Sequence, residues 1–155
     1  MGGGWGLGAI VESATALADA GMHVIAVAGR NPKLEQRLRA ALHPRIIPFG
    51  FTERIPELMA ACDLVITTPG DTCSEARFLG RHILMLDVVP GHGRENLQHE
   101  LELGGADVAN GDARSTVRQA IECLHRIDVT APDPPRSRDP WEHAFQQALE
   151  RLDLA

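Results

Sequence analysis

Short apolar runs alternate along the chain with segments in which apolar residues recur every three or four positions. The apolar runs predict strands at residues 22–28, 45–49, 64–68 and 83–89, and a short edge strand at 106–109. The periodic segments predict helices at residues 9–20, 32–42, 55–61, 72–80, 95–103 and 113–127. Strands of this length separated by helices indicate βαβ units, so the expected fold class is α/β, with a Rossmann-like parallel sheet flanked by helices.

A glycine-rich stretch at residues 2–8 precedes the first predicted helix. In nucleotide-binding α/β folds such a loop normally follows a strand, and in the common doubly wound order that first strand is central. The sequence has no apolar run before residues 2–8. We therefore expect a sheet that lacks its first strand and has a gap in the middle. This pattern suggests a C-terminal piece of a longer protein, or a wrongly placed start.

The carboxyl-terminal part of the chain differs from the rest in its amino-acid composition. Residues 129–140 are rich in Asp and hold four of the ten prolines, which indicates a linker. Apolar residues recur with helical spacing after it, which predicts a last helix within residues 141–155. The expected organisation is one Rossmann-like domain over residues 1–128, a Pro-rich linker and a C-terminal helix.

Composition narrows the class of protein. The 155 residues are 44% hydrophobic, enough for a sizeable core, and the net charge is −6, which argues against a basic nucleic-acid-binding surface. No apolar run approaches the roughly 18 residues that a membrane span needs. The three cysteines, Cys62, Cys73 and Cys123, form no CxxC pair, so we expect no metal site and a reducing, cytoplasmic setting.

The glycine-rich stretch is the first candidate for ligand chemistry. Gly4, Gly6 and Ala9 fit the pattern G-x-G-x-x-A, in which glycines let the backbone approach a phosphate at a helix N-terminus. The plainer interpretation is a tight strand-to-helix turn, but the density of glycine favours phosphate. The next predicted strand ends without the acidic residue of an NAD site, and Arg30 follows it. An NADP-binding domain therefore stays open as an alternative.

Residues 67–76 (TTPGDTCSEA) form a second motif, between an apolar strand and a helix. Loops at the carboxyl ends of parallel strands are where these folds bind anionic ligands. Thr72 and Glu75 also match the T-x-x-E capping box, and spacing alone favours that structural role. The Glu75 carboxylate could in addition accept hydrogen bonds from two ribose hydroxyls. Cys73 lies at the predicted helix start, and we interpret it as a packed thiol rather than a reactive one.

Residues 89–96 (VPGHGREN) form a third motif of the same kind, after a strand and before a helix. His92, Arg94, Glu95 and Asn96 supply donors and acceptors that suit a polyhydroxyl ligand. The alternative is a solvated loop with an ordinary helix start. The spacing of Ser, Cys, His and Asp residues gives no sign of a nucleophilic catalytic set.

Taken together, these segments resemble the C-terminal half of GT-B glycosyltransferases. The resemblance is to the group of monogalactosyldiacylglycerol synthases and processive diacylglycerol glucosyltransferases, and the lipid II-forming N-acetylglucosaminyltransferase shares the architecture. It covers about residues 2–127, and is carried by GGGWGLG, VIAVAGRN, IIPFGFTERIPELMAACDLVITTPGDTCSEA, VVPGHGREN and ELGGA in that order.

The resemblance implies a nucleotide-sugar-binding domain with a UDP-sugar as substrate, no cofactor and no metal. By this resemblance, Gly4, Trp5 and Gly6 would lie by the diphosphate, and Phe51 and Thr52 would flank the uracil. Gly70, Asp71 and Thr72 would cover the phosphates and the sugar, and the Glu75 carboxylate would hold the ribose hydroxyls. His92, Glu95 and Asn96 would contact the sugar hydroxyls.

The resemblance also implies a function. The chain would be the donor-binding half of an inverting hexosyltransferase that acts on a lipid or similar acceptor. In this family the N-terminal half supplies the acceptor groove and the general base, so we expect no catalytic residue here and no transfer without that partner domain. The full-length protein would be cytoplasmic and peripheral to the membrane, with no nucleic-acid partner. The alternatives are a stand-alone module that binds NADP or a nucleotide sugar without catalysis, and a non-functional fragment.

Overall fold

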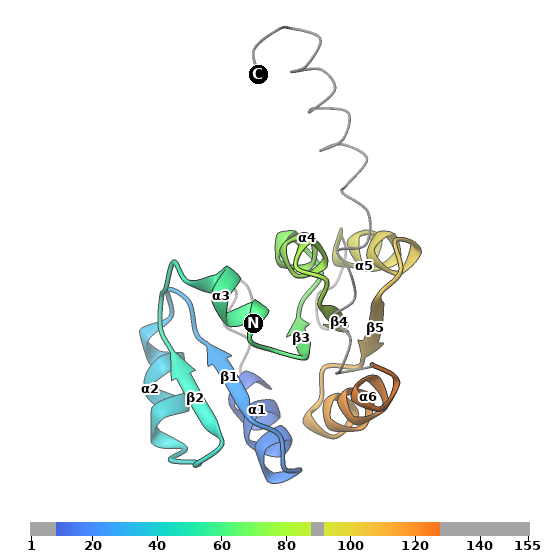
Figure 1. Ribbon diagram of the computed structural model, residues 1–155. Helices are drawn as coiled ribbons and strands as arrows, with labels where there is room; N and C mark the ends of the chain where they lie inside the picture. The colour runs from blue at the N-terminus through green and yellow to red at the C-terminus, as the bar shows by residue number, and fades with distance from the viewer. Residues whose placement is uncertain (1–8, 88–91, 128–155) are drawn as a thin grey trace, which may run out of the picture.

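The computed structural model describes residues 9–87 and 92–127. The predicted linker, the C-terminal helix and the glycine-rich loop with Gly4, Trp5 and Gly6 lie outside these residues. Helices and strands alternate along the described chain (Figure 1). The elements are α1 (Ala9–Asp19), β1 (Val24–Val27), α2 (Pro32–Ala40), β2 (Ile46–Phe49), α3 (Ile55–Ala60), β3 (Leu64–Thr67), α4 (Asp71–Phe78), β4 (His82–Leu86), α5 (His92–Glu102), β5 (Ala106–Ala109) and α6 (Ala113–Arg126).

Every described strand pair is parallel, as the sequence predicts. β1 pairs with β2, with Val24 opposite Ile46, and β3, β4 and β5 form a second sheet in that order. Some of the boundaries of the elements differ from the prediction. β4 begins at His82 and ends at Leu86, and α5 begins at His92, three residues before the expected position. The fold class is therefore α/β and Rossmann-like, with parallel sheets flanked by helices.

The sheet is interrupted between β1 and β3. These two strands belong to separate sheets, ordered β2-β1 and β3-β4-β5, and within the described residues no strand lies between them. The break falls at the position where the sequence predicts the missing first strand. It follows that each of the two sheets presents one edge toward the other.

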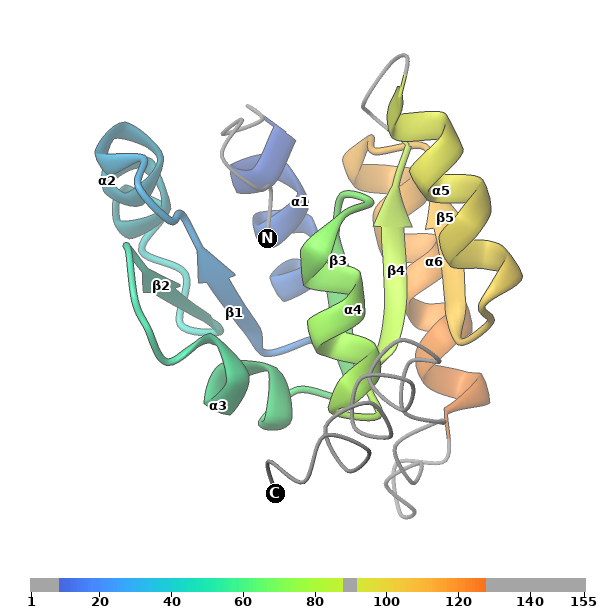
Figure 2. The ribbon, with the colours of Figure 1, turned by 90° about the horizontal axis from the view of Figure 1, so that it is seen from above.

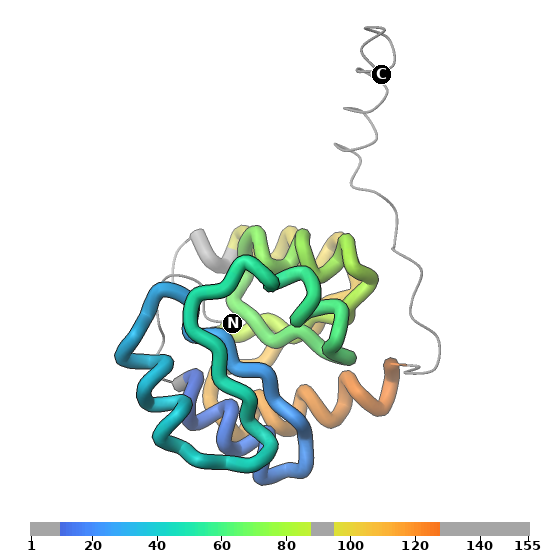
Figure 3. The backbone as a smooth tube through the Cα atoms, turned by 60° about the vertical axis from the view of Figure 1, so that its left-hand side comes forward, coloured from blue at the N-terminus to red at the C-terminus, as the bar shows by residue number. Residues whose placement is uncertain are grey.

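Helix α1 packs against both sheets. Ala14 and Ala18 lie in one core cluster with residues of β1, α2 and β2, while Leu17 belongs to a second cluster with Leu84 of β4 and Cys123 of α6. Alanines four residues apart lie on one helix face, and their small side chains let α1 approach β1 closely. Figure 3 shows α1 and α6 on the same side of the molecule.

The opposite face of the β3-β4-β5 sheet is covered by α4 and α5 (Figures 1 and 2). Cys73 and Ala76 of α4 are fully buried there against Ile83 and Met85 of β4, and Leu97 of α5 packs on the same cluster. None of the described helices has the length and apolar character needed to cross a membrane.

A buried ion pair joins α4 to α5. Arg77 Nη1 lies 2.7 Å from Glu100 Oε2, and the two side chains are only 18% and 8% exposed. The other terminal nitrogen of Arg77 donates hydrogen bonds to the backbone carbonyls of Glu100 and Gly104. The guanidinium group therefore fixes the end of α5 against α4.

Candidate functional site

The described residues of the predicted donor site follow the carboxyl ends of β2, β3 and β4. Phe51 and Thr52 come after β2, Gly70 and the start of α4 come after β3, and α5 begins six residues after the last residue of β4. β1 and β4 run in the same direction, so the loops that follow the strands of both sheets lie on one side of the molecule (Figure 2). This edge is where open α/β sheets bind ligands.

Phe51 lies against Arg30, the residue that follows β1. The Arg30 guanidinium carbon is 4.7 Å from the centroid of the Phe51 ring, within the range of a cation–π contact. Phe51 is nevertheless 59% exposed, which is unusual for so large an apolar ring. The two side chains offer flat surfaces at the carboxyl ends of β1 and β2. The sequence suggests Arg30 only as a partner for a phosphate, and it does not predict the contact of Arg30 with Phe51.

Thr52 organises its own loop. Its hydroxyl oxygen accepts a hydrogen bond from the backbone N–H of Arg54, at 3.1 Å, which is a local turn of the kind that Ser and Thr form. The next helix, α3, starts with Ile55 and Pro56. Thr52 is therefore held at a defined position next to Phe51.

The start of α4 differs from the predicted capping box. α4 begins at Asp71 and its N-cap is Gly70, with no side-chain hydrogen bond at the cap, so Thr72 lies within the first turn instead of before it. The reason is the backbone of Gly70, whose φ of 149° and ψ of −164° fall in a region used almost only by glycine. That conformation lets the helix begin one residue earlier. The capping interpretation of Thr72 and Glu75 is therefore wrong.

Without a capping role, Glu75 is an exposed carboxylate one turn into α4. Asp71 is also exposed, in the first turn, where the helix dipole favours negative charge. Cys73 lies beneath them, fully buried, and burial raises the pKa of its thiol. The interpretation of Cys73 as a packed thiol is confirmed.

The third motif is helical from His92 onward. The backbone of His92 starts α5, so this part of the motif is not the loop that its glycines suggest. Glu95 and Asn96 lie one turn further along and are exposed. The side chain of His92 lies outside the described residues. The described structure therefore brings Phe51, Thr52, Gly70 and α4 to the same edge as α5, and leaves the glycine-rich loop untested.

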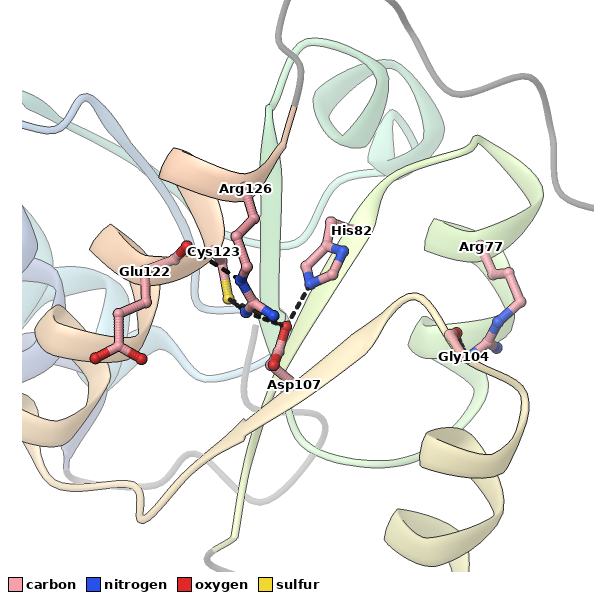
Figure 4. A network of polar contacts seen from close by, with 7 residues as sticks. All are labelled: Arg77, His82, Gly104, Asp107, Glu122, Cys123 and Arg126. Carbon is pink, nitrogen blue, oxygen red and sulfur yellow. Dashed lines mark hydrogen bonds and ion pairs between the residues drawn. The ribbon is translucent and has the colours of Figure 1, made fainter.

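A second polar cluster, formed by His82, Asp107, Cys123 and Arg126, is not predicted by the sequence (Figure 4). Asp107 Oδ2 lies 2.7 Å from His82 Nε2 and 2.7 Å from Arg126 Nη2, and it accepts a hydrogen bond from the Cys123 thiol at 3.4 Å. The cluster is at the amino end of β4, away from the loops described above. No motif signals it, because its members come from β4, β5 and α6.

This cluster contains the three residues of the described chain whose ligand atoms could converge on a metal ion, His82, Asp107 and Cys123. The Arg126 guanidinium already supplies positive charge to Asp107 and also lies 3.6 Å from the Cys123 sulfur. Burial raises the pKa of Asp107, but the hydrogen bonds from Arg126 and His82 outweigh it and leave the pKa lowered. Burial and the Asp107 charge raise the pKa of Cys123 to about 11.

We expect Cys123 to resist alkylation. With a thiol pKa of about 11, against about 8.5 for an ordinary cysteine, the thiolate fraction at pH 8 falls by more than tenfold. Iodoacetamide at pH 8, followed by mass spectrometry, should therefore leave Cys123 unmodified in the folded protein and modify it in urea. Asp107→Asn removes the negative charge that helps to raise the pKa and should speed the reaction. Equal rates in folded and unfolded protein would contradict this expectation.

Comparison with known proteins finds sequence similarity to part of the monogalactosyldiacylglycerol synthases and of the processive diacylglycerol glucosyltransferases. It is 32% identical over 131 residues to monogalactosyldiacylglycerol synthase 3 of Arabidopsis thaliana, covering 76% of this chain. It is 35% identical over 98 residues to the processive diacylglycerol β-glucosyltransferase of Bacillus pumilus, covering 61% of this chain. The matches span 28% and 26% of those two relatives. No family model matches the sequence.

The solved structures support the fold. A protein of Listeria monocytogenes, crystallised under the name of a UDP-N-acetylglucosamine 2-epimerase, superimposes with a TM-score of 0.65. The superposition covers 97% of this chain and 41% of the other, at 18% sequence identity. At that identity the likeness establishes the α/β architecture and nothing about the ligand.

Proposed function

Because the chain is homologous to one segment of the monogalactosyldiacylglycerol synthases and processive diacylglycerol glucosyltransferases, we propose that it is the UDP-sugar-binding part of a glycolipid-synthesising glycosyltransferase. The reaction would transfer a hexose to a lipid acceptor with inversion. The chain spans about a quarter of the length of these relatives. The acceptor groove and the general base would therefore come from a further domain, and this chain would not transfer sugar by itself.

The observation that carries the proposal is the start of α4. Gly70 brings bare backbone to the helix N-terminus without a side-chain cap, and Glu75 presents an exposed carboxylate one turn later. A helix N-terminus favours the negative charge of a diphosphate, because its first N–H groups have no partner within the helix. A carboxylate one turn away suits two vicinal ribose hydroxyls, which both donate hydrogen bonds. The start of α4 therefore suits the diphosphate of a nucleoside diphosphate, and the Glu75 carboxylate suits its ribose.

The remaining residues take roles around this centre. The exposed ring of Phe51, with Thr52 beside it, would flank the uracil, and Gly70, Asp71 and Thr72 would border the phosphates and the sugar. Glu95, Asn96 and His92 would read the sugar hydroxyls, and Gly4, Trp5 and Gly6 would border the diphosphate. The helix dipole and loop amides would stabilise the negative charge on the departing UDP, so the proposal assigns no cofactor or metal.

Two features bear on the alternative, an NADP-binding module. Arg30, which could pair with a 2′-phosphate, already lies against the Phe51 ring. The Asp71 carboxylate at the start of α4 would repel a diphosphate of either ligand and is expected to weaken both. The arrangement therefore favours the uridine nucleotide over NADP mainly through Glu75 and Phe51.

Saturation-transfer NMR on the whole chain, with UDP and NADP in separate samples, tests the proposal. We expect transfer to the uracil and ribose protons of UDP, and much weaker transfer to NADP. Phe51→Ala should reduce the uracil signals, whereas Phe78→Ala, which removes an equally exposed ring from the far end of α4, should not. Signals from NADP without signals from UDP would overturn the proposal in favour of the alternative.

A further inference from the structure

The second polar cluster lies on the face of the β3-β4-β5 sheet that α6 covers (Figure 4). His82 and Leu84 of β4 share this face, because alternate residues of a strand point the same way, and Asp107 of β5 is paired with Leu84. Cys123 reaches the cluster from α6, and Arg126 lies on the same side of that helix, three residues later. Three elements thus bring an imidazole, a carboxylate and a thiol together.

The spacing of these three groups is close to that of a metal site. Zinc binds His, Asp and Cys at about 2.0–2.3 Å, so neighbouring ligand atoms of a tetrahedral site are about 3.4–3.6 Å apart. Asp107 Oδ2 lies 3.4 Å from Cys123 Sγ and 2.7 Å from His82 Nε2, and all three atoms lie within 4.8 Å of one another. The imidazole and the carboxylate need to separate by only about 0.7 Å to admit the ion.

The donor set favours zinc over the hard cations. Magnesium and calcium take oxygen ligands, whereas zinc accepts nitrogen, oxygen and sulfur together. Three protein ligands leave the fourth position of the ion to a water molecule. Water can reach this position, because His82 and Asp107 are partly exposed, while Cys123 is buried beneath them.

A cation already lies at this cluster. The Arg126 guanidinium is 2.7 Å from Asp107 Oδ2 and 3.6 Å from Cys123 Sγ, but the arginine side chain is 59% exposed. Ion pairs with so exposed a partner contribute little free energy, so Arg126 can turn into solvent at low cost. A metal ion can therefore take over the positive charge that Arg126 supplies to Asp107.

We propose that His82, Asp107 and Cys123 form a zinc site that fixes the last turns of α6 to β4 and β5. The zinc ion displaces the Arg126 guanidinium from Asp107, and the Cys123 thiol releases its proton to solvent as the thiolate binds. The site is structural and lies at the amino ends of the strands, away from the loops of the proposed donor site. It therefore does not depend on the proposed function.

Cobalt substitution tests the site in the whole chain, since Co²⁺ accepts the same ligands and binds them more weakly than Zn²⁺. We expect reduced, EDTA-treated protein to bind about one Co²⁺ per chain and to show the near-ultraviolet charge-transfer band of a cobalt–thiolate bond. Zinc should remove this band and raise the melting temperature. Cys123→Ser should abolish the band, whereas Cys62→Ser, at a thiol outside the cluster, should leave it intact.

Zinc titration of further variants checks the location. His82→Gln should weaken zinc binding by about tenfold or more, and His99→Gln, on the exposed side of α5, should not. Arg126→Ala removes the competing cation and should strengthen binding by about fivefold, whereas Arg118→Ala, outside the cluster on α6, should have no effect. The absence of a thiolate band, a band that persists in Cys123→Ser, or equal affinities of the two histidine variants would overturn the proposal.

Discussion

Glu100→Gln should lower the free energy of unfolding by about 3–5 kcal/mol, the range seen when one partner of a buried ion pair is removed. Glu100 is 8% exposed and its carboxylate lies 2.7 Å from Arg77 Nη1. The substitution leaves the Arg77 guanidinium between α4 and α5 without a counter-charge. Urea denaturation followed by circular dichroism measures the change, and in so small a domain a loss of this size could prevent folding.

Two variants make this result interpretable. Glu12→Gln breaks an exposed pair with Arg37, whose side chains are 58% and 53% exposed, and should cost less than about 1 kcal/mol. The double substitution Arg77→Met with Glu100→Leu removes both charges and should recover much of the stability lost in Glu100→Gln. If Glu12→Gln and Glu100→Gln had the same small effect, the buried pair would not have the structural role described here.

Glu75→Gln should weaken UDP binding by about tenfold to a hundredfold and leave stability within about 0.5 kcal/mol. The loss of affinity follows from hydrogen bonds between ribose hydroxyls and a charged carboxylate, each worth about 1.5–3 kcal/mol. Stability should not change, because Glu75 is exposed and the N-cap of α4 is Gly70. Isothermal titration with UDP and thermal melting separate the two quantities.

Asp71→Asn is the matched control for Glu75→Gln, since it neutralises another exposed carboxylate on the same helix. Removing a negative charge beside a diphosphate should leave UDP affinity unchanged or increase it. A melting shift in Glu75→Gln together with unchanged UDP affinity would contradict the ribose role.

The sequence predicts the architecture well, because strands buried on both faces produce continuous apolar runs. β1, β2, β3 and β5 lie within the predicted ranges, and the parallel pairing is as expected. Helix starts are predicted less well. At α4 the T-x-x-E match is misleading, because the backbone of Gly70 starts the helix earlier. At α5 two glycines suggest a loop, but the helix includes Gly93 and packs through Leu97.

The sequence also predicts only part of the candidate site. Sequence position relative to the strands is enough to place Phe51, Thr52 and Gly70 at the carboxyl edge, because parallel strands all end on one side. The contact between Arg30 and Phe51 depends on how two loops approach each other, and no local pattern contains that information. The same is true of Asp107, whose partners lie 25 residues before it and 16 and 19 residues after it.

The position of α1 has a consequence for cooperativity. No β-ladder of the described residues joins the two sheets, so the packing of α1 on both cores is a principal link between them. Packing contacts between units are lost in local opening more readily than a continuous ladder of hydrogen bonds. The region of β1, α2 and β2 can therefore open as a foldon of its own while the three-stranded unit stays folded, and α1 determines how strongly the two transitions are coupled.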